Sequence, residues 1–236
     1  SLKNMRSDQL GSIVIKEVIK KSKFFTEEID EVIMGQVLTA GAGQNPARQA
    51  AINAGIPVSK PAHMINQVCG SGLRAVISGY QSIKLGESKN VISGGQENMS
   101  LAPHSIFYRD EKEISEDKLL DTMVNDGLID AFNNYHMGVT AENVAKKFNI
   151  TRQEQDEFAL KSQRKTELAI TNNKFDEEIV KINHNGNILD IDEHPRIGLK
   201  ISDLEKLKSA FQDNGTVTPG NSSGINDGAA ALLLTS

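Results

Sequence analysis

Short β-branched runs alternate with helical stretches over the first hundred residues, and this alternation restricts the possible folds more than any other feature. The β-branched runs are only a few residues long, and two of them end at glycines, as buried strands followed by turns do. The helical stretches carry apolar residues on one face. We expect strands at 31–38, 62–68 and 90–95 and helices at 8–20, 46–54 and 73–86. This order of elements predicts a layered α/β fold.

The character of the sequence changes after about one hundred residues and changes back near the end. Helical patterns dominate the middle, whereas the tail returns to glycine turns and an apolar run. Helices are expected at 142–148 and 153–172 and a strand at 229–234. The α/β domain is therefore predicted to consist of residues 1–100 and 221–236, and a mainly helical inserted lobe of residues 101–220.

The composition argues against several classes of protein. With 38% hydrophobic and 24% charged residues, the chain has the composition of a soluble protein that can bury a core. Its formal net charge of −5 and pI near 5.6 give no overall basic field, which argues against a general nucleic-acid binder. No apolar run approaches the roughly 20 residues of a membrane-spanning helix. The histidines are scattered without ligand spacing, so no metal site is expected.

Cys69 is the single cysteine of the chain, which excludes an intramolecular disulfide. A lone thiol suits a reducing compartment, and we expect a cytoplasmic protein. A buried structural cysteine is the commoner meaning of such a residue. Here, however, a predicted strand enters Cys69 and a glycine-containing turn leads from it into a helix. The N–H groups at a helix N-terminus favour a thiolate, so this pattern indicates a nucleophile.

Five segments of the chain resemble segments of the thiolase family and occur in the family's order. The resemblance covers nearly the whole chain, and the cysteine turn is one of the five segments. The segments are Asn66–Leu73, Gly35–Leu38 with Gly43–Arg48, Gly94–Ser100, Tyr135–Gly138 with Thr140–Asn143, and Gly215–Thr218 with Asn221–Gly228. The resemblance implies an α/β/α N-terminal domain with a mixed sheet and an inserted, mainly helical loop domain that binds coenzyme A.

The same resemblance implies an acyltransferase in which Cys69 carries the acyl group as a thioester. The expected reaction is the formation or thiolysis of acetoacetyl-CoA, with coenzyme A and acetyl-CoA as substrates and without a tightly bound cofactor. Covalent catalysis of this kind splits one difficult step into two easier ones. Backbone N–H groups at the cysteine turn would supply part of an oxyanion hole.

The resemblance also implies five binding residues. His136 and Met137 match the segment that lines the acyl pocket, and Ser223 matches a hydroxyl that contacts the pantetheine arm. Leu128 corresponds to an apolar wall of the same tunnel, and Arg196 to a basic residue near the nucleotide end of coenzyme A. Without the resemblance, these residues would be read as an ordinary histidine and methionine, a turn serine, a core leucine and a solvated arginine.

Family members have further elements that these 236 residues do not match. A first strand normally precedes the helix at residue 8, and a C-terminal repeat of the domain carries a histidine that activates the nucleophile and a second cysteine. We therefore expect thiolase activity of the full-length parent, and we expect residues 1–236 alone to be inactive because the acid/base groups are missing.

Two other functions are compatible with parts of the pattern. A ketoacyl synthase-like condensing enzyme would share the cysteine turn, but it lacks a long inserted lobe and uses an acyl carrier protein. A non-catalytic lipid-binding or assembly role would leave Cys69 inert. For the favoured thiolase reading, family resemblance implies a homodimer or homotetramer that acts in lipid and fatty acid metabolism.

Overall fold

The computed structural model describes residues 1–109, 115–184 and 186–236. Contacts between residues divide the chain into two compact units. The first unit consists of Ser1–Gly127 and Ile225–Ser236, and the second unit consists of Leu128–Gly224. The domain boundaries expected at residues 101 and 220 stay a prediction, because compact units defined by contacts need not coincide with domains.

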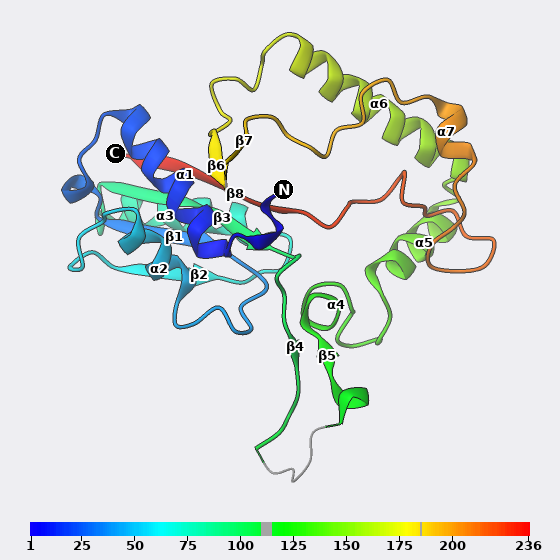
Figure 1. Cartoon of the computed structure of the whole chain (residues 1–236), viewed down its shortest axis with the longest axis horizontal. Helices are drawn as coiled ribbons and strands as arrows, with labels where there is room; N and C mark the ends of the chain where they lie inside the picture. Colours follow the sequence, from blue (N-terminus) through cyan, green and yellow to red (C-terminus); the bar gives the residue numbers. More distant parts are fainter. Residues whose placement is uncertain (110–114, 185) are drawn as a thin grey trace. The chain divides into compact units, whose positions relative to one another are not determined.

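The first unit is built on a four-stranded sheet in the order β2-β1-β3-β8. Its strands are β1 (Glu31–Gly35), β2 (Ala62–Ile65), β3 (Asn90–Asn98) and β8 (Asp227–Thr235). β1 runs parallel to both β2 and β3, whereas β8 runs antiparallel to β3 along its whole length, as Figure 1 shows for the green and red strands. The sheet is therefore mixed, as expected.

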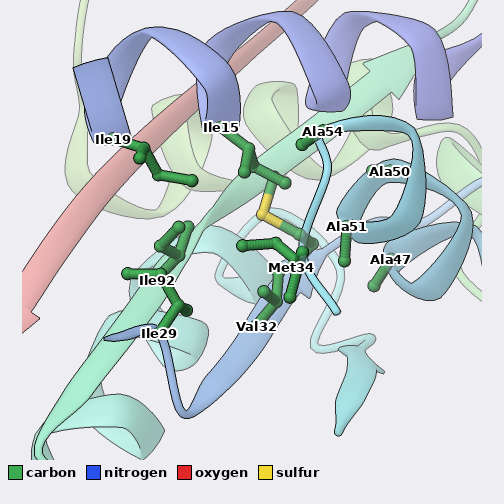
Figure 2. Packing of buried hydrophobic residues seen from close by; sticks show 11 residues of the cluster. Ile15, Ile19, Ile29, Val32, Met34, Ala47, Ala50, Ala51, Ala54 and Ile92 are labelled. Atoms are coloured by element: carbon green, nitrogen blue, oxygen red, sulfur yellow. The ribbon is translucent and has the colours of Figure 1, made fainter. Parts of the chain in front are cut away.

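Helices cover both faces of this sheet and make the first unit three layers thick. The helices are α1 (Ser7–Ser22), α2 (Pro46–Asn53) and α3 (Ser71–Leu85). Because side chains alternate along a strand, Val32 and Met34 of β1 pack in the cluster with α1 and α2, whereas Ile33 packs with α3. Figure 2 shows Ile15 of α1 directed toward Met34 in the first of these clusters. The expected layered α/β fold is thus confirmed.

The cap of α2 follows directly from its sequence. Asn45 precedes the helix, and its side-chain oxygen accepts a hydrogen bond from the N–H of Arg48 at 3.0 Å. Pro46 stands at the first helical position, where its missing N–H costs nothing. Ala47 and Ala50 face the core and are completely buried, so the small side chains allow the helix to pack closely.

α3 lies unusually close to the end of β1. A Cβ atom at Gly35 would lie 2.5 Å from the backbone nitrogen of Gly72 and from the carbonyl carbon of Ser71. Real Cβ atoms do not approach backbone atoms so closely, so only glycine fits at this position. The first turn of α3 therefore rests directly on the sheet, and this contact fixes the start of the helix.

The chain leaves the sheet after β3 and returns to it at β8. At this point the hydroxyl of Ser100 donates a hydrogen bond to the carboxylate of Asp227 at 2.7 Å, and the N–H of Ser100 donates to the same side chain. Short elements complete the first unit: η1 (Leu2–Asn4), η2 (Thr26–Glu28), β4 (His104–Ser105), η3 (Glu116–Lys118), β5 (Leu120–Asp121) and α4 (Thr122–Gly127).

The second unit is mainly helical in its described part. It contains α5 (Met137–Phe148), α6 (Arg152–Thr171) and α7 (Ile201–Glu205), with an antiparallel pair formed by β6 (Ile182–His184) and β7 (Asn187–Leu189). α6 begins with a capping box in which Thr151 and Glu154 bond each other's backbone N–H groups. Arg152 then pairs with the buried Asp156 one turn later, at 2.7 Å.

Two further properties concern the residues that the structure describes. None of the helices among them is long and apolar enough to cross a bilayer. Those residues also contain no group of three or more histidine, cysteine, aspartate or glutamate side chains that could hold a metal ion.

Candidate active site

Cys69 lies on the connection between β2 and α3, two residues before the first residue of the helix. Its thiol is free and exposed to solvent, so the thiol is not a buried packing group. The strand expected to reach residue 68 ends at Ile65, because the residues after it form the turn that presents the cysteine. The expected succession of strand, cysteine turn and helix is otherwise present.

The turn reverses the chain through two consecutive hydrogen bonds. The N–H of Gly70 donates to the carbonyl of Gln67 at 3.0 Å, and the N–H of Ser71 donates to the carbonyl of Val68 at 3.1 Å. Val68 has a φ of 48°, in the left-handed region that β-branched residues rarely adopt. Cys69 is therefore held at the apex of a tight and unusual backbone conformation.

Glu97 lies near the end of β3 in the first unit and was not singled out from the sequence. Its carboxylate accepts hydrogen bonds from the N–H groups of Val37 at 2.8 Å and Leu38 at 3.3 Å. Burial raises the pKa of Glu97 above its ordinary value, and these backbone hydrogen bonds offset only part of the rise. The side chain thus holds the segment that follows β1.

Leu128, His136 and Met137 come together in the second unit. The N–H of Met137 donates to the carbonyl of Leu128 at 2.8 Å, and Ile129 forms an antiparallel bridge with His136. The six residues between Ile129 and His136 therefore fold back as a loop. Three of the binding residues implied by the sequence resemblance are thus neighbours.

His136 caps α5 and stacks on a phenylalanine that the sequence did not indicate. Its Nδ1 atom accepts a hydrogen bond from the N–H of Gly138 at 2.9 Å, so the proton of the neutral ring is on Nε2. The ring lies 4.7 Å from the ring of Phe211, at an interplanar angle of 24°. Any side chain at Gly138 would overlap Phe211. In the sequence, the stacking of His136 on Phe211 was signalled only by Gly138, the small residue in the motif that contains His136.

Glu142 of α5 anchors the loop that precedes Ser223. Its carboxylate accepts hydrogen bonds from the N–H and hydroxyl of Thr216, each at 2.8 Å, and from the N–H of Val217 at 2.7 Å. Burial alone would raise the pKa of Glu142, but these hydrogen bonds together hold it below its ordinary value. Glu142 was noted only as part of a motif, because its partners are distant in sequence.

Ser223 is exposed on a loop that Asn221 ties to α6. The amide nitrogen of Asn221 donates to the buried carboxylate of Asp156 at 2.9 Å, and its oxygen accepts from the N–H of Thr218 at 2.7 Å. The hydroxyl of Ser222 donates to the carbonyl of Thr218 at 2.7 Å. The position of Ser223 is thereby fixed by its neighbours.

Arg196 is exposed, and its backbone N–H donates to the side chain of Gln163 on α6 at 2.8 Å. Among the residues that the structure describes, no hydrogen bond or ion pair of its guanidinium group is present. Cys69 belongs to the first unit, whereas Arg196, Ser223 and the group around His136 belong to the second.

Comparison with protein families and known proteins gives a consistent result. The family model of the thiolase N-terminal domain matches residues 1–236. An acetyl-CoA acetyltransferase of Rhizobium meliloti (strain 1021) is 51% identical over 98% of the chain and 60% of its own length. A cytosolic acetyl-CoA acetyltransferase of Rattus norvegicus is 50% identical over 95% of the chain and 58% of its own length.

A solved structure gives the same answer for the fold. The Acat5 thiolase from Ascaris suum, crystallised in complex with coenzyme A, superposes with a TM-score of 0.93 at 38% identity. The match covers all of this chain and 61% of that one. The chain thus spans about 60% of the length of the curated relatives it matches. From the match along its whole length and from the shared fold, we conclude that this chain belongs to the thiolase family.

Proposed function

We propose that the protein to which these residues belong is an acyltransferase that makes or cleaves acetoacetyl-CoA, with Cys69 as its nucleophile. The single observation that carries this proposal is the exposed, free thiol of Cys69 on a tight turn immediately before α3. An exposed thiol can meet a large thioester substrate, and cysteine is a nucleophile that can carry an acyl group as a thioester. Membership of the thiolase family supports the same reaction class.

In the first step, the sulfur of Cys69 attacks the carbonyl carbon of an acyl-CoA thioester. A new carbon–sulfur bond forms, the bond between the acyl carbon and the sulfur of coenzyme A breaks, and coenzyme A leaves with the proton from the Cys69 thiol. In the second step of condensation, the methyl carbon of a second acetyl-CoA loses a proton and bonds to the acyl carbon, the bond from that carbon to the sulfur of Cys69 breaks, and the sulfur regains a proton. Thiolysis is the reverse: Cys69 attacks the 3-oxo carbon of acetoacetyl-CoA, the bond between C2 and C3 breaks, acetyl-CoA leaves with a proton on C2, and the thiol of coenzyme A then takes the acyl group and returns its proton to Cys69. Backbone N–H groups near the turn would stabilise the charge on the carbonyl oxygen.

Coenzyme A and its thioesters are the proposed substrates, and no tightly bound cofactor is required. The names of the relatives support this choice, since they are acetyl-CoA acetyltransferases, and the Ascaris suum thiolase was crystallised with coenzyme A. His136, Met137 and Leu128 would form the acyl pocket. Ser223 would contact the pantetheine arm, and Arg196 would lie near the nucleotide.

The test uses the intact protein and acetyl-CoA. Mass spectrometry of the quenched protein should find one acetyl group on the peptide that contains Cys69, and acetyl-CoA should protect this peptide from iodoacetamide. Cys69→Ala should abolish both acetylation and turnover. A Cys69→Ala variant with normal activity would exclude the proposal. Residues 1–236 expressed alone are proposed to show alkylation of Cys69 but no turnover.

We also propose a homodimer or homotetramer, a cytoplasmic location and a role in lipid metabolism for the intact protein. The cytosolic rat relative supports the location. Sedimentation of the intact protein would measure its mass, and a monomeric mass would contradict the oligomer. Fractionation of the cells that make it would locate it, and recovery with membranes would contradict the cytoplasmic assignment.

A further inference from the structure

The residue before Cys69 has a backbone conformation that requires support. Val68 has a φ of 48°, and its branched side chain is half exposed, so the packing of that side chain cannot explain the conformation. A β-branched residue in the left-handed region is strained and stays there only where the surroundings determine it. The hydrogen bonds around Val68 identify those surroundings.

The hydroxyl of Ser71 binds both sides of this strained residue. It donates a hydrogen bond to the carbonyl of Val68 at 2.6 Å and accepts one from the N–H of Gln67 at 2.8 Å. The backbone N–H of Ser71 donates to the same Val68 carbonyl at 3.1 Å. That carbonyl belongs to the peptide group whose nitrogen is that of Cys69. Ser71 therefore fixes the plane of the peptide from which the cysteine side chain projects.

Asn66 also holds the backbone of Val68, from the other end of the turn. Its side-chain oxygen accepts a hydrogen bond from the N–H of Val68 at 3.0 Å. Its side-chain nitrogen donates to the carbonyl of Val37 at 3.4 Å, in the segment held by Glu97. Both the N–H and the carbonyl of Val68 are thus bound by groups outside Val68 itself.

Ser71 can hold the turn because Ser71 itself cannot move toward the sheet. It is only 4% exposed, and the carbonyl carbon and oxygen of its backbone lie 2.5 Å and 2.7 Å from the place where a Gly35 side chain would begin. The sheet therefore fixes the backbone of Ser71. Because the hydroxyl of Ser71 bonds the cysteine turn, the turn is held in a fixed position relative to the sheet.

We propose that Ser71 is a positioning residue for Cys69: its hydroxyl holds Val68 in the left-handed conformation and so directs the thiol toward the acyl carbon. This inference rests on the proposed function, in which Cys69 is the acyl-accepting nucleophile. Small errors in the direction of a nucleophile are costly, because reaction requires a near-attack geometry. Ser71 does not itself touch the reacting atoms.

The first test measures acetylation of Cys69 in a single turnover of the intact protein. Ser71→Ala should slow acetylation at saturating acetyl-CoA by about tenfold or more, while the acetyl-CoA concentration for half-saturation stays within about twofold. Ser71→Thr keeps the hydroxyl and should recover most of the rate. Ser82→Ala is the matched control, because Ser82 is also buried on α3 but bonds Glu31 and Ser88 instead. Ser82→Ala should leave the rate unchanged.

The second test separates this inference from the proposed function. The amide of Val68 bonds Asn66 and not Ser71, so its hydrogen exchange reports the turn rather than the lost hydroxyl. Ser71→Ala should accelerate this exchange about tenfold, and Ser82→Ala should not. If the wild type is never acetylated, the proposed function fails, and the exchange still decides whether Ser71 holds the turn. Unchanged exchange in a folded Ser71→Ala variant would overturn the inference.

A third variant tests the mechanism by which Ser71 acts. Glycine adopts the left-handed conformation without strain. In a Val68→Gly variant, the hydrogen bonds of the Ser71 hydroxyl are therefore no longer needed to hold residue 68 in this conformation. The loss of rate caused by Ser71→Ala should therefore be several times smaller in a Val68→Gly background than in the wild type. An equal loss in both backgrounds would show that Ser71 acts by some route other than Val68.

Discussion

The carboxylate of Glu142 binds Thr216 through both the backbone N–H and the hydroxyl of that residue, although 74 residues separate the two in the sequence. Glu142 is 4% exposed, so its hydrogen bonds are protected from water. Removing a buried acceptor leaves its donors unsatisfied, which costs about 1–3 kcal/mol for each donor. This pair therefore contributes to the stability of the second unit and to the position of the loop that carries Ser223.

Glu142→Gln should lower the free energy of unfolding by about 1 kcal/mol or more, because the amide loses the charge and keeps only one acceptor oxygen, and its nitrogen cannot accept the hydrogen bonds that the second carboxylate oxygen takes from Thr216. Glu142→Ala should lower it by roughly 3 kcal/mol, because the donors of Thr216 and Val217 lose their acceptor. Urea denaturation followed by circular dichroism measures both. Glu205→Gln, at an exposed site, is the control and should change stability by less than about 0.5 kcal/mol.

The cost of Glu142→Gln should depend on pH. The pKa of Glu142 is lowered in the folded protein, so its carboxylate stabilises the fold above the ordinary carboxyl pKa of 4.5. That contribution is lost as the pH falls through the lowered value. The difference in the free energy of unfolding between the wild type and Glu142→Gln should be largest at neutral pH and should shrink in acid. A difference in stability that grew in acid would contradict the conclusion that the charged form of Glu142 stabilises the fold.

Glu97→Gln should show the opposite dependence on pH. Burial raises the pKa of Glu97, so the protonated side chain is favoured in the folded protein and the charged one is penalised. Relative to Glu97→Gln, the wild type should be most stable in acid and should lose stability as the pH rises through the raised pKa. Urea denaturation across a pH series measures the difference, and a difference independent of pH would be the contrary result.

Gly35→Ala should destabilise the first unit by about 3 kcal/mol or more. The new methyl group would lie 2.5 Å from backbone atoms of Ser71 and Gly72, which cannot move as a flexible side chain could. Gly228→Ala is the matched control within the same sheet, since no atom lies within 4 Å of its new Cβ. Thermal unfolding of the two variants should differ clearly, and equal melting temperatures would contradict the close packing of α3.

Val68→Gly should raise the free energy of unfolding by about 1 kcal/mol. The left-handed conformation of Val68 costs of order 1–3 kcal/mol, and glycine removes this strain at an entropic cost of roughly 0.5–1 kcal/mol. The side chain is 50% exposed, so little buried area is lost. Val68→Ala keeps the Cβ atom and should show no such gain. Equal stability of the glycine and alanine variants, measured by urea denaturation, would contradict the strain.

Replacement of Phe211 by leucine tests the stack with His136. Leucine keeps most of the apolar volume but loses the aromatic face, and an aromatic pair contributes about 0.5–1.5 kcal/mol beyond its buried area. We expect a loss of stability in this range and a weaker apparent affinity for acetyl-CoA, because the orientation of His136 would no longer be fixed. Binding equal to that of the wild type would separate Phe211 from the acyl pocket.

Local sequence signals predicted the elements well where local chemistry ends them. Asn45 and Pro46 begin α2 as expected, and α3 stops before Gly86, which has a φ of 77°. The run at 229–234 is confirmed as part of β8. These signals act within a few residues, so they can be recognised without a knowledge of the tertiary structure.

The ends of three strands could not be predicted, because partners distant in sequence determine them. β1 ends at Gly35 rather than at residue 38, since the carboxylate of Glu97 takes the N–H groups of Val37 and Leu38. β3 continues to Asn98 because β8 pairs with it as far as Asp227. β2 ends at Ile65 because the cysteine turn begins there.

The site shows the same division. Cys69 could be singled out because a strand, a glycine-containing turn and a helix are local patterns. His136 and Met137 were indicated by a motif, but Phe211 was not. Phe211 lies 75 positions after His136, and no sequence pattern around Phe211 indicates that its ring stacks on the ring of His136. The hydrogen bonds of the Ser71 hydroxyl likewise depend on the left-handed conformation of Val68. Valine disfavours this conformation, so the sequence does not predict it.

The pairing of β8 with β3 also sets the order in which the chain can fold during synthesis. Ser100 and Asp227, which meet at the edge of that pairing, are 127 residues apart, and the ribosome needs on the order of ten seconds to add so many. Throughout this interval the edge of β3 has no partner from β8, and such edges invite aggregation. The nascent chain therefore passes through an aggregation-prone stage, during which the second unit emerges and β3 is not yet paired with β8.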